Sequence, residues 1–141
     1  DIPSPYLTGV FDKLLANAPK NDLWNGTIET NRGCPFACTF CDWGSLTNSK
    51  IIKFKLDRVF AEIEWFGKNG LPFINLTNAN YGVFKERDNL IADKIVESKK
   101  LYSVPTGLSV SYAKNSNADV FGLIRKFQEA GVGSGFTNSS I

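Results

Sequence analysis

Segments with the pattern of a β-strand alternate three times along this chain with segments that have the pattern of a helix. The connections between them are short, so each helix has to return the chain across one face of a sheet to a parallel strand, in a right-handed crossover. The alternation predicts an α/β fold with about four parallel strands, arranged as an open sheet or a partial (β/α) barrel. The predicted strands span residues 24–31, 71–77, 106–112 and 133–139.

Apolar residues at spacings of three and four mark the helices between these strands. The Asn69-Gly70 pair is suited to end the first helix, predicted at 56–68, and Gly131 to follow the end of the third. Asn117 is a suitable N-cap for that third helix. The apolar positions are Leu56, Val59, Phe60, Ile63 and Phe66, then Leu90, Ile91, Ile95 and Val96, then Val120, Phe121, Ile124 and Phe127.

Three cysteines lie together directly after the first predicted strand, in the segment RGCPFACTFCDWG of residues 32–44. Cys34, Cys38 and Cys41 have the spacing C-x3-C-x2-C, and the chain has 3 cysteines and no histidine. An odd number of clustered cysteines does not suit a disulfide framework. In a parallel sheet, loops at the carboxyl ends of the strands carry function, so the position favours a metal site.

Three thiolates suit one kind of metal centre better than others. A structural zinc site needs four ligands, and only Asp42 stands nearby as an oxygen donor. A four-iron four-sulfur (4Fe-4S) cluster held by three thiolates instead keeps one iron open to a small molecule. The residues therefore favour an iron-sulfur cluster. A non-enzymatic zinc module, an electron-transfer protein and unligated structural cysteines remain as alternatives.

The cysteine spacing, Phe40 before the third cysteine, and the place of the loop in an α/β repeat resemble the radical S-adenosylmethionine (radical SAM) superfamily. The resemblance covers nearly the whole chain. It implies a partial (β/α) barrel in which Cys34, Cys38 and Cys41 hold the 4Fe-4S cluster. It further implies that SAM chelates the open iron and is cleaved reductively to a 5'-deoxyadenosyl radical, which attacks a small-molecule or metabolite substrate. A reducing partner such as flavodoxin or ferredoxin would supply the electron.

The same resemblance suggests where SAM binds. The family has a glycine-rich, acidic segment after its second strand, and residues 77–82 stand in that place with amides where an acidic side chain is expected. Phe40, Asn78, Asn80 and Ser111 are the expected cofactor-binding residues. The asparagines also suit an ordinary turn in the loop 78–88, and Ser111 also suits a half-exposed strand. Glu29 and Arg32 are candidates for the pocket or for an ion pair that steadies the loop.

Residues 1–23 are expected to form an extended connector, because Pro3 and Pro5 restrict the backbone, and residues 24–141 to form the barrel core. The connector and the Cys41-Asp-Trp-Gly-Ser45 segment resemble a branch of the family that carries a cobalamin-binding domain before the core. This resemblance implies cobalamin, bound by a domain outside this chain, and methylation of an unactivated carbon. The alternatives are an arm that covers the bottom of the barrel and a cobalamin-independent radical SAM enzyme.

Charge and hydropathy bear on which partners and which cellular location the chain is expected to have. A net charge of +2 with scattered lysines predicts no nucleic-acid binding, and there is no apolar run long enough to span a membrane. With no export signal in these residues, a cytoplasmic location is expected. The chain begins with Asp1, has no methionine and stops at Ile141 in mid-pattern, so we expect it to be a piece of a longer protein.

Overall fold

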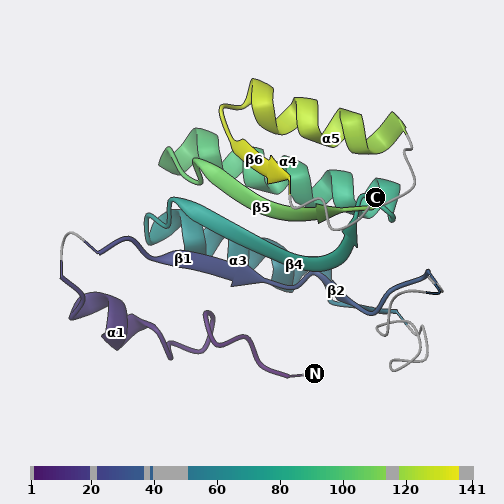
Figure 1. Ribbon diagram of the computed structural model, residues 1–141. Coiled ribbons are helices and arrows are strands. Elements are labelled where there is room, and N and C mark those ends of the chain that lie inside the picture. The colour runs from purple at the N-terminus through teal and green to yellow at the C-terminus, as the bar shows by residue number, and fades with distance from the viewer. Residues whose placement is uncertain (1, 20–21, 37–38, 40–50, 114–117, 137–141) are drawn as a thin grey trace.

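Four parallel strands form the main sheet of the protein (Figure 1). The structure, a computed structural model, describes residues 2–19, 22–36, 39, 51–113 and 118–136. The strand order is β1-β4-β5-β6. This arrangement confirms the predicted α/β fold. The strands are β1 (Asn25–Ile28), β4 (Phe73–Tyr81), β5 (Gly107–Tyr112) and β6 (Gly133–Phe136).

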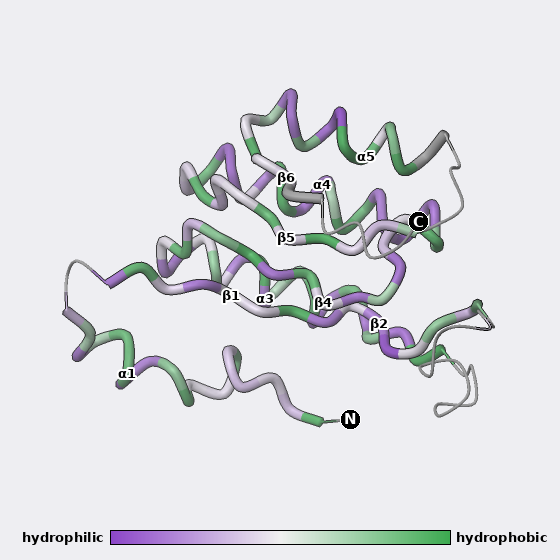
Figure 2. Tube along the Cα trace, in the orientation of Figure 1, coloured by the Kyte–Doolittle hydropathy of each residue, from purple (hydrophilic) through white to green (hydrophobic). Residues whose placement is uncertain are grey.

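Three helices return the chain between these strands and pack on one face of the sheet (Figure 1). They are α3 (Leu56–Lys68), α4 (Lys85–Tyr102) and α5 (Ala118–Glu129). Their apolar stripes, visible as alternating colours around α5 in Figure 2, meet fully buried strand residues. The core between the two layers includes Ile28, Val59, Ile63, Phe66, Ile74, Leu76, Ile91, Ile95, Leu108, Val110, Leu123 and Phe127.

The other face of the sheet carries small polar residues. In β5, Leu108 and Val110 are fully buried against the helices, while Ser109 and Ser111 alternate with them and are half-buried. The strand register places Asn75 of β4 beside Ser109. Because successive side chains of a strand point to opposite faces, these residues mark the face that the helices leave uncovered.

The first predicted strand, 24–31, is wrong in its second half. β1 ends at Ile28, and Asn31–Arg32 (β2) pairs antiparallel with Ile52–Lys53 (β3) in a separate two-stranded sheet. The chain leaves the main sheet because Thr30 is held by side chains from β4 and α4. The cysteine-containing segment therefore lies between the two strands of this small ladder, β2 and β3.

The second strand is longer than predicted. β4 runs to Tyr81, so Asn78 and Asn80 belong to a strand and not to a loop. Its pairing with β5 shifts register after Leu76 and resumes between Tyr81 and Tyr112. The polar side chains of Asn78 and Asn80 make hydrogen bonds in this strand, so these turn-forming residues can continue it. α4 begins at Lys85, inside the segment predicted as a loop.

The N-terminal segment turns where an extended path was expected. Residues 5–11 form consecutive turns, followed by a short helix, α1 (Asp12–Ala16). In the turns before α1, the ring centre of Tyr6 lies 4.7 Å from that of Phe66 and 5.1 Å from that of Trp65, both on α3. The segment thus packs along the edge formed by β1 and α3 (Figure 1). Among the described residues, no helix is long and apolar enough to cross a membrane.

Candidate functional site

Cys34 and Asn80 meet beyond the carboxyl end of β1. Gly33, with φ of 100°, turns the chain out of β2, and the half-buried Cys34 follows it. The side-chain nitrogen Nδ2 of Asn80 donates a hydrogen bond to Sγ of Cys34 over 3.0 Å. Asn80 is 4% exposed, and its carbonyl oxygen Oδ1 is buried without a hydrogen-bond partner in the described structure. The contact brings together two residues that lie 46 positions apart in the chain.

Asn78 anchors the strand junction just below this contact. Its Oδ1 accepts from the backbone N–H of Thr30 at 3.0 Å, and its Nδ2 donates to Oγ1 of Thr30 and to Oδ1 of Asn31. Asn78 is 1% exposed. Because its carbonyl and amino groups both have protein partners, Asn78 fixes the place where β1 passes into β2.

Arg87 of α4 binds the two segments that enter and leave the cysteine loop, at Thr30 and Phe54, which we call the neck of the loop. Its Nη2 donates to the backbone oxygens of Thr30, at 3.0 Å, and Phe54, which face each other at one end of the β2–β3 ladder. The Phe54 N–H also donates to the Thr30 oxygen, at 3.1 Å. Partial burial lowers the pKa of Arg87 from its usual value. Since an arginine keeps its charge well above neutral pH, both bonds are charge-assisted.

Asp88 holds the turn that follows β4. Its Oδ2 accepts from the backbone N–H groups of Gly82, at 2.8 Å, and Phe84, at 3.0 Å. Its backbone oxygen accepts from the hydroxyl of Tyr81. Burial raises the pKa of Asp88 above its usual value, against the opposing effect of these N–H groups. Burial also raises the pKa of Tyr81 well above its usual value, and the charge of Asp88 adds to this effect.

The remaining predicted site residues divide into two groups. Cys38, Cys41 and Phe40 lie outside the described residues. Ser111 is half-buried on the sheet face that the helices leave uncovered. Within the described parts of the chain, no group of three or more Cys, Asp and Glu side chains is arranged to hold a metal ion.

Glu29 and Arg32 form the ion pair that the sequence left open as one of two possibilities. Nη2 of Arg32 lies 2.7 Å from Oε2 of Glu29, and Nε contacts both carboxylate oxygens. The hydrogen bond to Glu29 raises the pKa of Arg32. With the carboxylate engaged in this way, the pair steadies the turn between β1 and β2.

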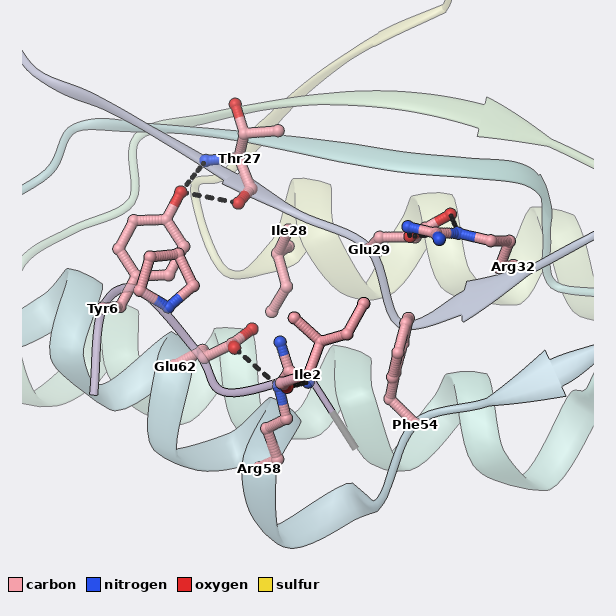
Figure 3. A pocket seen from close by; sticks show the side chains of 10 residues that line it. Ile2, Tyr6, Thr27, Ile28, Glu29, Arg32, Phe54, Arg58 and Glu62 are labelled. Atoms are coloured by element: carbon pink, nitrogen blue, oxygen red, sulfur yellow. Dashed lines mark hydrogen bonds and ion pairs between the residues drawn. The ribbon is translucent and has the colours of Figure 1, made fainter. Parts of the chain in front are cut away.

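A cavity of about 220 Å³ lies beside this turn, between the N-terminal segment, β1 and α3 (Figure 3). Its charged side chains pair with each other: Arg58 Nε lies 2.9 Å from Glu62 Oε1, and Arg32 binds Glu29. Arg58 also donates to the backbone oxygen of Ile2. Cys34 and Asn80 do not line this cavity, so we regard it as a packing feature of the N-terminal segment.

The described donors suit an iron-sulfur cluster at Cys34. A thiolate ligand of such a cluster accepts hydrogen bonds, and an N–H of Asn80 points at the sulfur from a buried position. The unpartnered oxygen of Asn80 is suited to accept from a cationic ligand next to the cluster.

Sequence reasoning missed Thr30, Arg87 and Asp88. Their sequence signals are weak, because Arg87 and Asp88 read as ordinary polar residues in the first turn of a helix.

Two bacterial proteins are similar to this chain over almost its whole length. It is 40% identical over 140 residues to the cobalamin-dependent radical SAM methyltransferase TokK of Streptomyces tokunonensis. The alignment covers 99% of this chain and 20% of TokK. The chain is thus homologous to a cobalamin-dependent radical SAM methyltransferase. This finding confirms the radical SAM resemblance and its cobalamin branch.

A second relative gives the same coverage. It is the 2-(S-pantetheinyl)-carbapenam-3-carboxylate methyltransferase of Streptantibioticus cattleyicolor, 39% identical over 99% of this chain and 20% of its own length. The chain therefore spans about a fifth of the length of these two relatives. No protein-family model matches the chain.

Solved structures of a radical SAM methyltransferase share the fold. TsrM from Kitasatospora setae, with cobalamin and a [4Fe-4S] cluster bound, superposes with a TM-score of 0.59 at 19% identity. The match covers 76% of this chain and 21% of TsrM. A second TsrM structure, with tryptophan substrate and the SAM analogue aza-SAM, also gives 0.59, at 18% identity, over 77% of this chain and 20% of TsrM.

Proposed function

We propose that this chain is the cluster-bearing part of a radical SAM enzyme that methylates a small molecule with the help of cobalamin. The hydrogen bond from Asn80 to Sγ of Cys34 carries the proposal, because it directs a buried N–H at the first of three closely spaced cysteines. The similarity to TokK and the fold of TsrM support it.

In this proposal Cys34, Cys38 and Cys41 provide three thiolates to a 4Fe-4S cluster. When bound, the cluster supplies the electron that cleaves SAM to methionine and a 5'-deoxyadenosyl radical. Gly33 turns Cys34 out of the β2–β3 ladder, and Arg87 keeps the two strands of that ladder together. The protein thereby fixes the ends of a segment that has to place three sulfurs around one cluster.

The SAM-binding residues of the proposal are Asn80, Ser111 and Phe40. The free oxygen of Asn80 would accept a hydrogen bond from the ammonium group of SAM, in place of the carboxylate that the family places nearby. Ser111 lies on the uncovered face, where a ligand has access. Asn78 was predicted among these residues, but its bonds to Thr30 and Asn31 favour a supporting role.

The methyl transfer and its partners extend the proposal to the full-length protein. Residues 24–141 would form the first part of the barrel core, and residues 1–23 would connect it to a cobalamin-binding domain. One relative methylates a carbapenam carboxylate and a TsrM structure holds tryptophan, so we propose a small organic substrate. A flavodoxin or ferredoxin would act as the reductant, and a cytoplasmic location suits such a partner.

The test uses full-length protein purified without oxygen and supplied with iron, sulfide and hydroxocobalamin. We expect a brown protein that retains the corrin through gel filtration and that forms 5'-deoxyadenosine when reduced with SAM. Replacing Cys34 with Ala should abolish this product, while Ser98→Ala, a change in the helical layer, should keep it. A colourless zinc protein, or undiminished product from Cys34→Ala, would overturn the cluster assignment. Corrin-free protein that still cleaves SAM would overturn only the cobalamin part.

A further inference from the structure

Hydrogen bonds fix the backbone at Asn80, whose side chain reaches Cys34. The backbone oxygen of Asn80 accepts from Val83 N–H at 3.4 Å, and the next residue, Tyr81, is fully buried. The Tyr81 hydroxyl binds Asp88 at 2.7 Å, and its backbone oxygen accepts from Ala113 N–H at 2.8 Å. These bonds fix the backbone from which the Asn80 side chain reaches the sulfur.

Burial makes this N–H electrostatically effective. Asn80 is 4% exposed, so bulk water neither competes strongly for its amino group nor screens its dipole strongly. The ion pair on the adjoining turn, Glu29 with Arg32, is internally neutralised. The dipole of the Asn80 amide therefore acts directly on the Cys34 sulfur.

We propose that Asn80 raises the reduction potential of the cluster by donating a hydrogen bond to the Cys34 thiolate. This inference rests on the proposed function. The sulfur becomes more electron-rich when the cluster gains an electron, so the N–H stabilises the reduced form more than the oxidised form. Only the part of this hydrogen bond's strength that depends on the oxidation state of the cluster shifts the potential. We expect it to change the ratio of reduced to oxidised cluster about tenfold, or about 59 mV for one electron.

This effect of Asn80 on the reduction potential is separate from its proposed role in SAM binding. The oxygen of Asn80 is proposed to face SAM, whereas the potential depends on its nitrogen and on Cys34. A measurement without SAM therefore isolates the nitrogen. It also separates this inference from the proposed function, which predicts only that the cluster forms and cleaves SAM.

The experiment is a redox titration of the reconstituted full-length protein, without SAM, with the reduced cluster followed by electron paramagnetic resonance. Iron and sulfide are measured in each sample. At the midpoint potential of the unsubstituted protein, Asn80→Ala should lower the ratio of reduced to oxidised cluster about tenfold. Asn80→Asp, nearly identical in shape, should lower it further, because a carboxylate replaces the donor. Asn69→Ala removes an amide that donates to a backbone oxygen at the far end of α3, and should leave the ratio unchanged.

The outcomes are distinct. An unchanged midpoint in Asn80→Ala and Asn80→Asp, with normal iron content, would overturn the inference and leave the proposed function standing. Loss of iron from both variants, with iron retained in Asn69→Ala, would also overturn it, because Asn80 would then support the folding of the loop. If the unsubstituted protein bound no iron, the proposed function would fail first.

Discussion

Arg87 donates from the first turn of α4 to the backbone oxygen of Thr30, 3.0 Å away, where the chain has just left β1. The same nitrogen binds the oxygen of Phe54, so one side chain joins the strands that enter and leave the cysteine segment. Lys53 reinforces this contact, because its ammonium lies 3.7 Å from the centre of the Phe84 ring. The helical layer thus supports the segment expected to hold the cluster.

Replacing Arg87 with Ala should loosen that support. The backbone oxygens of Thr30 and Phe54 would lose a charged donor, at a cost of about 1.5–3 kcal/mol. Hydrogen exchange in the full-length protein should quicken at residues 30–34 and 52–54, and retained iron should fall. Arg125→Ala, at an exposed position on α5, is the control and should change neither quantity. Equal protection in both variants would show that Arg87 does not hold the neck.

Asn78→Ala should destabilise the strand junction. The N–H of Thr30 and the side chain of Asn31 would lose buried partners, which costs about 1–3 kcal/mol for each unsatisfied group. Asn78→Asp keeps an acceptor for Thr30 N–H but loses the donor to Asn31, so it should expose part of the effect. The opening free energy of the Thr30 amide, from hydrogen exchange, measures both changes. Protection that stays the same in Asn78→Ala would contradict this assignment.

The sequence predicts the sheet and the helices well because both depend on local periodicity. The range 56–68 and the helices after it follow from apolar spacing, and the structure confirms them. Asn78 and Asn80 could not be read correctly in the same way. Asparagines favour turns when considered alone, yet these two continue β4 because their partners, Thr30 and Cys34, stand 48 and 46 positions earlier.

The candidate site shows the same division. The spacing of the cysteines points to a cluster because three thiolates in one loop are a local feature of the sequence. The support from Arg87 depends on contacts 57 and 33 positions away, which a single sequence does not display. Glu29 and Arg32 lie three positions apart, so their pairing was within reach of sequence reasoning as one of two readings.

Asp88 should make the turn after β4 sensitive to pH. Its pKa is raised by burial, so the folded chain binds this proton more tightly than the unfolded chain. Its contribution to stability is therefore full below the unfolded pKa of about 3.9 and declines as pH rises through the folded pKa. As pH rises from 4, the opening free energy of amides 82–88 should fall in the unsubstituted protein. Asp88→Asn, which has no titrating group at this position, should lose less, so the difference between the two proteins should grow. Hydrogen exchange, corrected for intrinsic rates at each pH, gives this difference, and a constant difference would refute the linkage.

Tyr6→Phe should free the outer edge of β1 without removing the aromatic packing. The Tyr6 hydroxyl accepts from Thr27 N–H at 3.2 Å and donates to Thr27 oxygen at 2.7 Å. Phe keeps the ring against Trp65 and Phe66, so the expected loss is the net value of the hydrogen bonds, about 0.5–1.5 kcal/mol each. Faster exchange confined to Thr27 and its neighbours is the expected result. Loss of protection throughout α3 would mean that the ring had also moved.

The contact between α3 and α4 provides a paired test of packing. A methyl group at Gly67 would meet Ser98 Oγ at 2.5 Å and the ring of Tyr102, so Gly67→Ala should push the helices apart. Overpacking costs about 1–3 kcal/mol, and the better helix propensity of Ala returns roughly 0.5–1 kcal/mol of that. Gly122 in α5 has no atom within 4 Å of the same methyl position, so Gly122→Ala should gain the propensity term alone.

The same Gly→Ala substitution is therefore expected to destabilise the protein at Gly67 and to stabilise it at Gly122. Opening free energies from hydrogen exchange should fall in α3 and α4 for Gly67→Ala and rise in α5 for Gly122→Ala. Stabilisation by both changes would show that Ser98 and Tyr102 yield easily, and that the two helices are less closely packed than the contact at Gly67 indicates.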